Sequence, residues 1–105
     1  VPLTFTDAAS LPDGSWVFTA VAEATDNSYL DGACVGAAIG VIDRADELIC
    51  VQVVDACYKI EGIAASVQDD QVHLLLVTDA DDPNTPASLL SATLVGYPFS
   101  SSQRP

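Results

Sequence analysis

An internal repeat constrains this chain more than any other feature of its sequence. The segment Ser10–Asn27 (SLPDGSWVFTAVAEATDN) aligns without a gap with Ser66–Pro83 (SVQDDQVHLLLVTDADDP), at an offset of 56 residues. Each copy follows an Ala-Ala pair, contains a turn pair (Asp13-Gly14 or Asp69-Asp70) and continues into an apolar run. A repeat of this length indicates a fold built from consecutive copies of one supersecondary unit.

Each copy has the pattern of a series of antiparallel strands. Short runs rich in Val, Ala, Leu and Ile alternate with clusters of Gly, Pro and Asp, and no segment has a helical period of adequate length. An Asp-Gly pair between two apolar runs is a strong hairpin signal. The predicted strands are about Leu3–Ala9, Ser15–Ala22, Val35–Asp43 and Leu48–Asp55 in copy one, then Tyr58–Ala65, Gln71–Thr78 and Ser88–Val95 in copy two.

A four-stranded meander that repeats every ~40–60 residues is typical of a β-propeller blade. We therefore predict an all-β chain of two four-stranded antiparallel blades, about residues 1–56 and 57–99, with a tail at 100–105. The fourth strand of the second blade would come from Gly96–Phe99 or from the N-terminus of a neighbouring chain. The alternative is a small β-sandwich, which also has about seven short strands.

Two blades are too few to close a propeller, because rings usually contain about four to eight. An isolated pair would also expose two large blade faces to water. We therefore predict a closed homo-oligomer of two, three or four chains, since cyclic symmetry removes the exposed faces. Among these, we prefer a homotrimer, which would form a six-bladed ring.

The charge of the chain is strongly negative. Three basic residues (Arg44, Lys59 and Arg104) stand against fifteen acidic ones, which gives a formal net charge of -12. Nucleic acid is therefore excluded as a partner, because phosphate binding needs a basic surface. Anionic membranes are disfavoured for the same reason. The acidic surface serves either solubility or the binding of a hard divalent cation such as Ca²⁺.

The cysteines and the termini leave the compartment open. Cys34, Cys50 and Cys57 are odd in number and match no common zinc spacing, so Cys34 and Cys50 are interpreted as small core residues. A Cys50–Cys57 disulfide is a minor alternative. We expect a soluble protein without a signal peptide, because the start of the chain lacks a basic region followed by an apolar stretch and every apolar run is too short to span a bilayer.

Three stretches resemble a known family. AVAEATDNSYLDGACVGAAIGVID (Ala20–Asp43), KIEGIAA (Lys59–Ala65) and LLLVTDADDPNTPASLL (Leu74–Leu90) resemble the C-terminal part of an uncharacterised family of bacterial β-propellers. The Glu-Gly pair is also similar to a strand start in phytase-like esterase propellers. The resemblance covers about Trp16–Leu94, although in that family the blocks lie within one longer chain.

A more distant resemblance is to the six-bladed calcium-dependent phosphotriesterases and lactonases. In those enzymes Glu, Asn and Asp side chains hold a central Ca²⁺ at the mouth of the channel. The resemblance implies a comparable site here, but fold alone does not transfer function.

Glu61 is the first candidate for that site. It starts a predicted innermost strand within an apolar run, where a carboxylate must be hydrated, paired or bound to a metal. Glu23, Asp26 and Asn27 end the second strand of copy one, and Asp79, Asp81 and Asp82 occupy the matching loop of copy two. We predict Glu61, Glu23 and Asp26 as catalytic groups and Glu61, Glu23, Asn27 and Asp79 as Ca²⁺ ligands.

Simpler interpretations remain for all of these residues. Asp, Asn and Pro favour turns, so the acidic loops can be turn-rich surface loops. Tyr29 and Asp31 are weaker candidates, and His73, the only histidine, is interpreted as a strand residue with satisfied hydrogen bonds. The chain has no Ser-His-Asp or Cys-His signature and no Gly-rich phosphate loop.

Two functions are compatible with these residues and with the resemblance. The first is a calcium-dependent hydrolase of small esters, lactones or phosphotriesters, in which the metal stabilises the charge that develops on the substrate oxygen. A carboxylate would attack the substrate or activate water. The second is a non-catalytic propeller fragment that is structural or binds calcium.

Overall fold

The computed structural model describes residues 3–24, 33–54, 59–78, 84 and 88–99. These residues form seven strands: β1 (Leu3–Ser10), β2 (Trp16–Ala24), β3 (Ala33–Ile42), β4 (Leu48–Val53), β5 (Ile60–Gln68), β6 (Gln71–Thr78) and β7 (Leu89–Val95). All seven predicted strands are confirmed, and their bounds differ from the predicted ones by a few residues. Within the described part of the chain no helix is long and apolar enough to cross a membrane.

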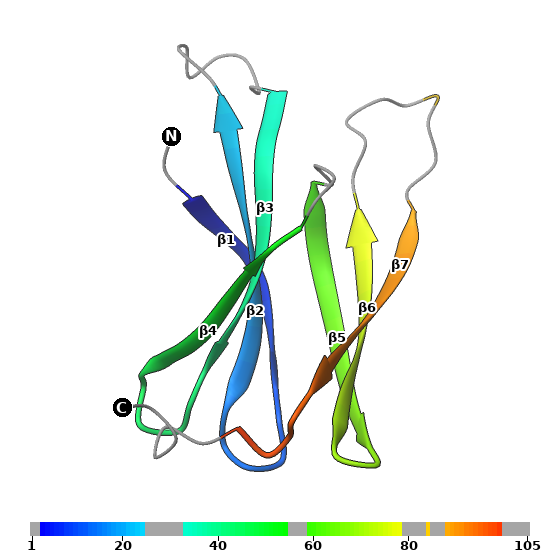
Figure 1. The fold of residues 1–105 in the computed structure, drawn as a ribbon. Coiled ribbons are helices and arrows are strands. Elements are labelled where there is room, and N and C mark those ends of the chain that lie inside the picture. Colours follow the sequence, from blue (N-terminus) through cyan, green and yellow to red (C-terminus); the bar gives the residue numbers. More distant parts are fainter. Residues whose placement is uncertain (1–2, 25–32, 55–58, 79–83, 85–87, 100–105) are drawn as a thin grey trace.

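The strands form two antiparallel sheets, each a simple meander (Figure 1). The first sheet has the order β1-β2-β3-β4 and the second has the order β5-β6-β7. Each sheet begins with the first strand of one repeat copy, so the boundary between the sheets falls between the two copies. The prediction of a fourth strand at Gly96–Phe99 in copy two is wrong, because this segment follows β7 as irregular backbone with bends at Gly96 and Pro98.

The turns explain why the chain reverses where it does. Asp69 and Asp70 both have positive φ, 53° and 61°, and they join the paired residues Gln68 and Gln71. Positive φ at both central residues defines the two-residue turn that best fits the twist of a hairpin. Asp tolerates this conformation because its short side chain bonds locally.

Two other hairpins whose turns lie within the described residues use a longer turn. In the β1–β2 turn, Gly14 has a φ of 88° and its N–H donates to the Leu11 carbonyl over 3.1 Å. The β3–β4 turn has the same design, with Asp46 (φ 62°) donating to the Asp43 carbonyl over 2.9 Å. Both turns therefore place a residue of positive φ before the second strand.

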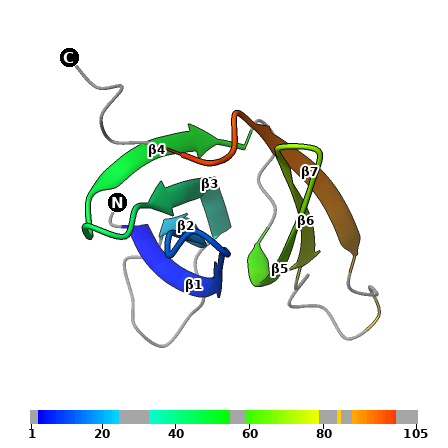
Figure 2. The ribbon, with the colours of Figure 1, turned by 90° about the horizontal axis from the view of Figure 1, so that it is seen from below.

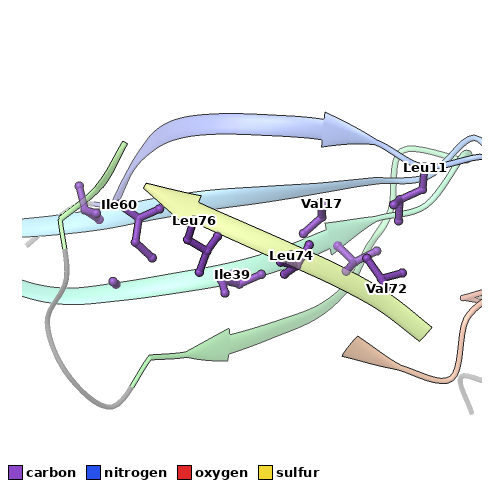
Figure 3. Packing of buried hydrophobic residues seen from close by; sticks show 10 residues of the cluster. Leu11, Val17, Ile39, Ile60, Val72, Leu74 and Leu76 are labelled. Carbon is purple, nitrogen blue, oxygen red and sulfur yellow. The ribbon is translucent and has the colours of Figure 1, made fainter. Parts of the chain in front are cut away.

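The core lies between the two sheets (Figure 3). Side chains of β2 and β3 on one side and of β5 and β6 on the other form one apolar cluster. Val17 and Val41 of the first sheet and Ile60, Val72 and Leu74 of the second are at most 1 % exposed. Full burial of one such side chain contributes about 1.5–3 kcal/mol relative to exposure.

The sheets approach each other most closely along their first strands. In the view along the strands β1 and β5 lie side by side, and β4 and β7 lie farthest from this contact (Figure 2). The strand of the second sheet that comes nearest to the first is β5, which faces β1 and β2. Tyr97 and Phe99, which follow β7, are partly buried and pack against the core. The space between the sheets is therefore a wedge that is narrowest at β1 and β5.

Candidate functional site

Glu61 lies at an irregularity in β5. The pairing of β5 with β6 shifts between Ile60 and Gly62, so Glu61 occupies a β-bulge on the edge strand that faces β1. Its side chain is exposed, while the neighbouring Ile60 is fully buried. The exposed carboxylate is accessible to water, so it carries no burial penalty that a partner or a metal would have to offset.

The structure describes few of the other predicted site residues. Glu23 belongs to β2, where its backbone pairs with that of Cys34 beyond a register shift at Ala22. Asp26, Asn27, Tyr29, Asp31, Asp79, Asp81 and Asp82 lie outside the described residues. Among the residues that are described, no three His, Cys, Asp or Glu side chains lie close enough together to hold a metal ion.

Sequence reasoning missed the acidic residue that links the two sheets. Asp7 lies at a bulge in β1, and its Oδ2 accepts a hydrogen bond of 2.9 Å from the Ile63 N–H of β5. This bond and a second one from the Ala8 N–H lower the pKa of the Asp7 carboxyl. Asp7 and Ile63 are 56 residues apart, so they occupy the same position in the two repeat copies. The repeat offset could have pointed to this pair.

A second polar contact lies deeper between the sheets. The hydroxyl groups of Thr6 and Thr19 are 2.7 Å apart, and Thr19 is fully buried. A buried hydroxyl without a partner would be costly, so this bond explains how β2 carries a Thr on its core side.

A third missed contact ties the end of the chain to the first sheet. The Asp13 N–H donates to the hydroxyl oxygen of Tyr97 over 3.0 Å. The Tyr97 N–H in turn donates to the Asp70 carbonyl over 3.1 Å. Tyr97 therefore connects the β1–β2 turn with the β5–β6 turn, two turns that correspond in the repeat. No local sequence pattern predicts a contact across 84 residues.

Two further predictions concern Cys50 and His73. Cys50 is wrong as a core residue: it is an exposed free thiol on the edge strand β4, although partial burial raises its pKa. The alternative disulfide partner, Cys57, lies outside the described residues. The predicted alternation around His73 is confirmed, because Val72 and Leu74 are buried in the core and His73 lies on the opposite side of β6.

The outer face of the first sheet is apolar. Its exposed side chains belong to positions that pair across β1 to β4 and therefore point to one side. We call this surface the aromatic face. It comprises the exposed residues Phe5, Trp16, Leu48, Val51 and Val53, together with Phe18, which is buried. Phe5 is 71 % exposed, and its ring meets that of Phe18 in an edge-to-face arrangement at a centroid distance of 4.9 Å. A hollow of about 300 Å³ lies between Phe5, Trp16, Phe18 and Ile42.

The outer face of the second sheet is apolar as well, but its centre is lined by small side chains. Leu75, Val77, Leu89 and Val95 are the large exposed residues on it, and Val95 is 72 % exposed. Between them lies a hollow of about 360 Å³ whose lining includes Ala64, Ser66, His73, Ser91 and Thr93. We call this surface the hollow face.

These two faces carry every large hydrophobic side chain that is exposed in the described residues. Nine such side chains occur, five on the aromatic face and four on the hollow face. Soluble monomers rarely expose contiguous apolar patches of this kind, and such patches mark interaction surfaces. The sequence pattern did contain this signal, because the strand runs are apolar nearly throughout and do not alternate.

The fold and these surfaces define an all-β protein of two antiparallel meander sheets that share a core and present apolar faces outward. The chain belongs to a family of unknown function (DUF6910), whose model matches residues 1–83. The match covers the first sheet together with β5 and β6, and it ends before β7. No curated protein and no solved structure matches the chain.

Proposed function

We propose that the chain is a structural two-blade unit of a β-propeller, which assembles through its outer faces. The observation that carries this proposal is the position of the nine exposed hydrophobic side chains of the described residues, all of which lie on the two outer faces. In a β-sandwich the outward positions of each sheet are polar, because only the inner faces are buried. Sheets that are apolar on both sides belong in a stack of more than two.

The contact between the two sheets also favours the propeller over the sandwich. Consecutive propeller blades are related by rotation, so equivalent positions of neighbouring blades meet on their innermost strands. Asp7 and Ile63 are equivalent positions of the repeat, and they are joined by a hydrogen bond between β1 and β5. Both strands are edge strands that start their sheets.

The mass of the native particle tests this proposal. The expected result is a defined oligomer, with three times the 10.9-kDa chain mass for a six-bladed homotrimer. Light scattering across a range of protein concentrations measures it. A monomer at every concentration would reject assembly as the function of the outer faces, whereas a dimer or tetramer would change only the blade count.

A calcium-dependent hydrolase is the second candidate, and the position of Glu61 favours it. This exposed carboxylate lies on the strand that is innermost in the proposed blade, where a central metal would be bound. The test is the hydrolysis of neutral aryl esters, lactones and phosphotriesters with calcium and with excess chelator. Chelator-sensitive turnover that Glu61→Gln abolishes supports it, and absence of turnover in all conditions leaves the structural function alone.

A further inference from the structure

We propose that the aromatic face of one copy of this chain binds the hollow face of a second copy, in the arrangement that the two sheets already adopt within one chain. The partner is thus a second copy, and the contact is heterologous, so that two different surfaces meet. This inference rests on the proposed assembly and names the surfaces that perform it.

The repeat relates each outer face to an inner one. Val72, Leu74 and Leu76 point from β6 into the core, and an offset of 56 residues places them on Trp16, Phe18 and Ala20. These three residues of β2 lie on the outward side of the first sheet, where Trp16 is exposed and Phe18 and Ala20 are buried. The aromatic face is therefore the counterpart of the surface with which the second sheet meets the first.

The same offset relates the opposite pair of surfaces. Val17 and Val21 point from β2 into the core, and their counterparts are His73 and Val77 on the hollow face. The aromatic face is thus equivalent to the inner surface of the second sheet, and the hollow face is equivalent to the inner surface of the first sheet. Both equivalent surfaces face outward. A second copy supplies the matching surface at both ends of the chain.

The sizes of the side chains support this pairing. Trp16 and Phe18 of the aromatic face are larger than their core counterparts Val72 and Leu74. On β7 the hollow face has smaller side chains than the inner surface of the first sheet has on β3, whereas on β6 its His73 and Leu75 are larger than their counterparts Val17 and Thr19. By strand pairing, Ser91 and Thr93 of β7 correspond to Ile39 and Val41 of β3.

The hollow therefore lies where the larger side chains would enter. Small side chains such as Ala64, Ser66, Ser91 and Thr93 line it together with the larger His73 and Leu75, and about 360 Å³ is open at the centre of the hollow face. Two aromatic faces brought together would instead oppose bulky side chains to bulky side chains and leave the hollow of each hollow face unfilled. Close packing thus selects the heterologous pair.

A mixing experiment with two face variants tests the pairing. Trp16→Glu places a charge on the aromatic face, and Leu75→Glu places one on the hollow face. The matched control is Gln52→Glu, which adds the same charge at an exposed position of β4 on the other side of the sheet. Masses are measured by light scattering for each variant alone and for an equal mixture of the two.

A heterologous contact predicts that each face variant is monomeric by itself, because each lacks one of the two surfaces. The mixture forms a dimer of one chain of each kind, since one intact aromatic face meets one intact hollow face. The control keeps the wild-type mass. If each variant alone forms a dimer and mixing adds nothing, like faces pair and the inference is wrong, although assembly itself stands.

A second pair of variants guards against misfolding. Phe5→Glu and Val77→Glu change the same two faces at other positions, and circular dichroism shows whether each variant keeps its strands. A folded pair that stays monomeric after mixing, beside an oligomeric wild type, would overturn the pairing. A monomeric wild type would instead reject the proposed assembly, so the two failures are distinguishable.

Discussion

Single residues hold the two sheets together at their narrowest contact. Asp7 is an exposed residue, yet its carboxylate accepts the Ile63 N–H and so satisfies a donor on the edge of the second sheet. The same bond stabilises the charged form of Asp7 and lowers the pKa of its carboxyl. The stability of the contact between β1 and β5 therefore depends on pH.

The sign of this dependence follows from linkage. Because the pKa of Asp7 is lower in the folded chain than in the unfolded chain, its contribution is complete above the unfolded pKa, about 3.9. The contribution is lost as the pH falls through the folded pKa. We expect the unfolding temperature of Asp7→Asn to fall less between pH 5 and 2 than that of the wild type.

Thermal unfolding followed by circular dichroism measures this difference. The matched control is Asp69→Asn, which also removes one carboxylate but lies in a turn where Asn tolerates positive φ. The control shows how much of any change follows from the loss of a carboxylate that takes no part in the bond between β1 and β5. Identical curves for Asp7→Asn and the wild type would show that the bond to Ile63 adds no pH-dependent stability.

Gly40 is constrained by the ring that covers it. A Cβ atom at this position would lie 2.3 Å from Cζ of Phe18, which is far closer than van der Waals contact. Gly40→Ala should therefore displace the Phe18 ring and destabilise the fold by about 1–3 kcal/mol. Urea denaturation measures the change in the free energy of unfolding.

Gly36 on the same strand provides the control for this prediction. The nearest atom to a Cβ at Gly36 is Cβ of Ala22, at 4.0 Å, so Gly36→Ala meets no obstacle. Its free energy of unfolding should stay within about 0.5–1 kcal/mol of the wild type, because Ala also restricts the unfolded chain. Equal costs for both variants would mean that Phe18 moves aside without penalty.

At the scale of elements, strands and turns were predictable because their signals are local. All seven strands were found from apolar runs bounded by Asp, Gly and Pro, and Asp69-Asp70 forms the predicted turn. The bulge at Glu61, the bond from Ile63 to Asp7 and the position of Tyr97 were not predicted. They depend on how distant strands meet. Cys50 was assigned to the core because its run is apolar, and it does pair with the core residue Val41, but it is exposed because β4 is the edge strand of its sheet.

The candidate site was less predictable than the fold. The chemistry of Glu61 depends on how exposed its side chain is. The alternating pattern of a strand does not predict the exposure of a residue in a bulge, because the bulge interrupts that alternation. The loop acids carry no periodic signal, and they lie outside the described residues. The lack of alternation along the strands indicated that the outer faces are apolar. The difference between the large side chains of the aromatic face and the small ones at the centre of the hollow face could be recognised only from the register of the strands.

The β5–β6 turn offers a prediction at this scale. Two consecutive Asp residues with positive φ are less suited to this turn than Asn-Gly, which is its preferred sequence. Changing Asp69 to Asn and Asp70 to Gly together should stabilise the fold by about 0.5–1 kcal/mol, as strain and charge repulsion fall. Denaturant unfolding measures the gain.

A substitution in the opposite direction serves as the control. Asp70→Val places a β-branched residue at a φ of 61°, which such residues rarely adopt. This variant should lose stability by at least about 1 kcal/mol. A stable Asp70→Val variant would show that this hairpin does not depend on its turn.

At the scale of the whole molecule, charge opposes assembly while the apolar faces favour it. Each chain carries a formal net charge of -12, and association brings these charges closer together. Raising the ionic strength shortens the screening length from about 30 Å at 0.01 M to about 10 Å at 0.1 M. We therefore expect tighter association at the higher salt concentration, by at least about tenfold in dissociation constant.

Sedimentation at several protein concentrations measures this salt dependence. Calcium and sodium at matched ionic strength separate screening from binding, and excess chelator removes the metal. A gain specific to calcium would indicate that acidic side chains bind the ion, as the resemblance implies. Weaker association at high salt would show that charged contacts, rather than the apolar faces, hold the copies together.

The wedge between the sheets has a consequence for the number of copies. The two sheets meet at β1 and β5 and lie farther apart toward β4 and β7, so a fixed rotation angle relates one sheet to the next. If every contact between copies has that same rotation angle, the volume of the side chains between the sheets sets the angle. The angle in turn sets how many copies close the ring. Tyr97 and Phe99 pack against this core, and Tyr97 also joins the β1–β2 turn to the β5–β6 turn, so the size of these two rings helps to set the angle between the sheets. A smaller side chain at Phe99 would then reduce the angle between neighbouring sheets and allow a further copy to join the ring. The diameter of the assembly would change although neither contacting face is altered.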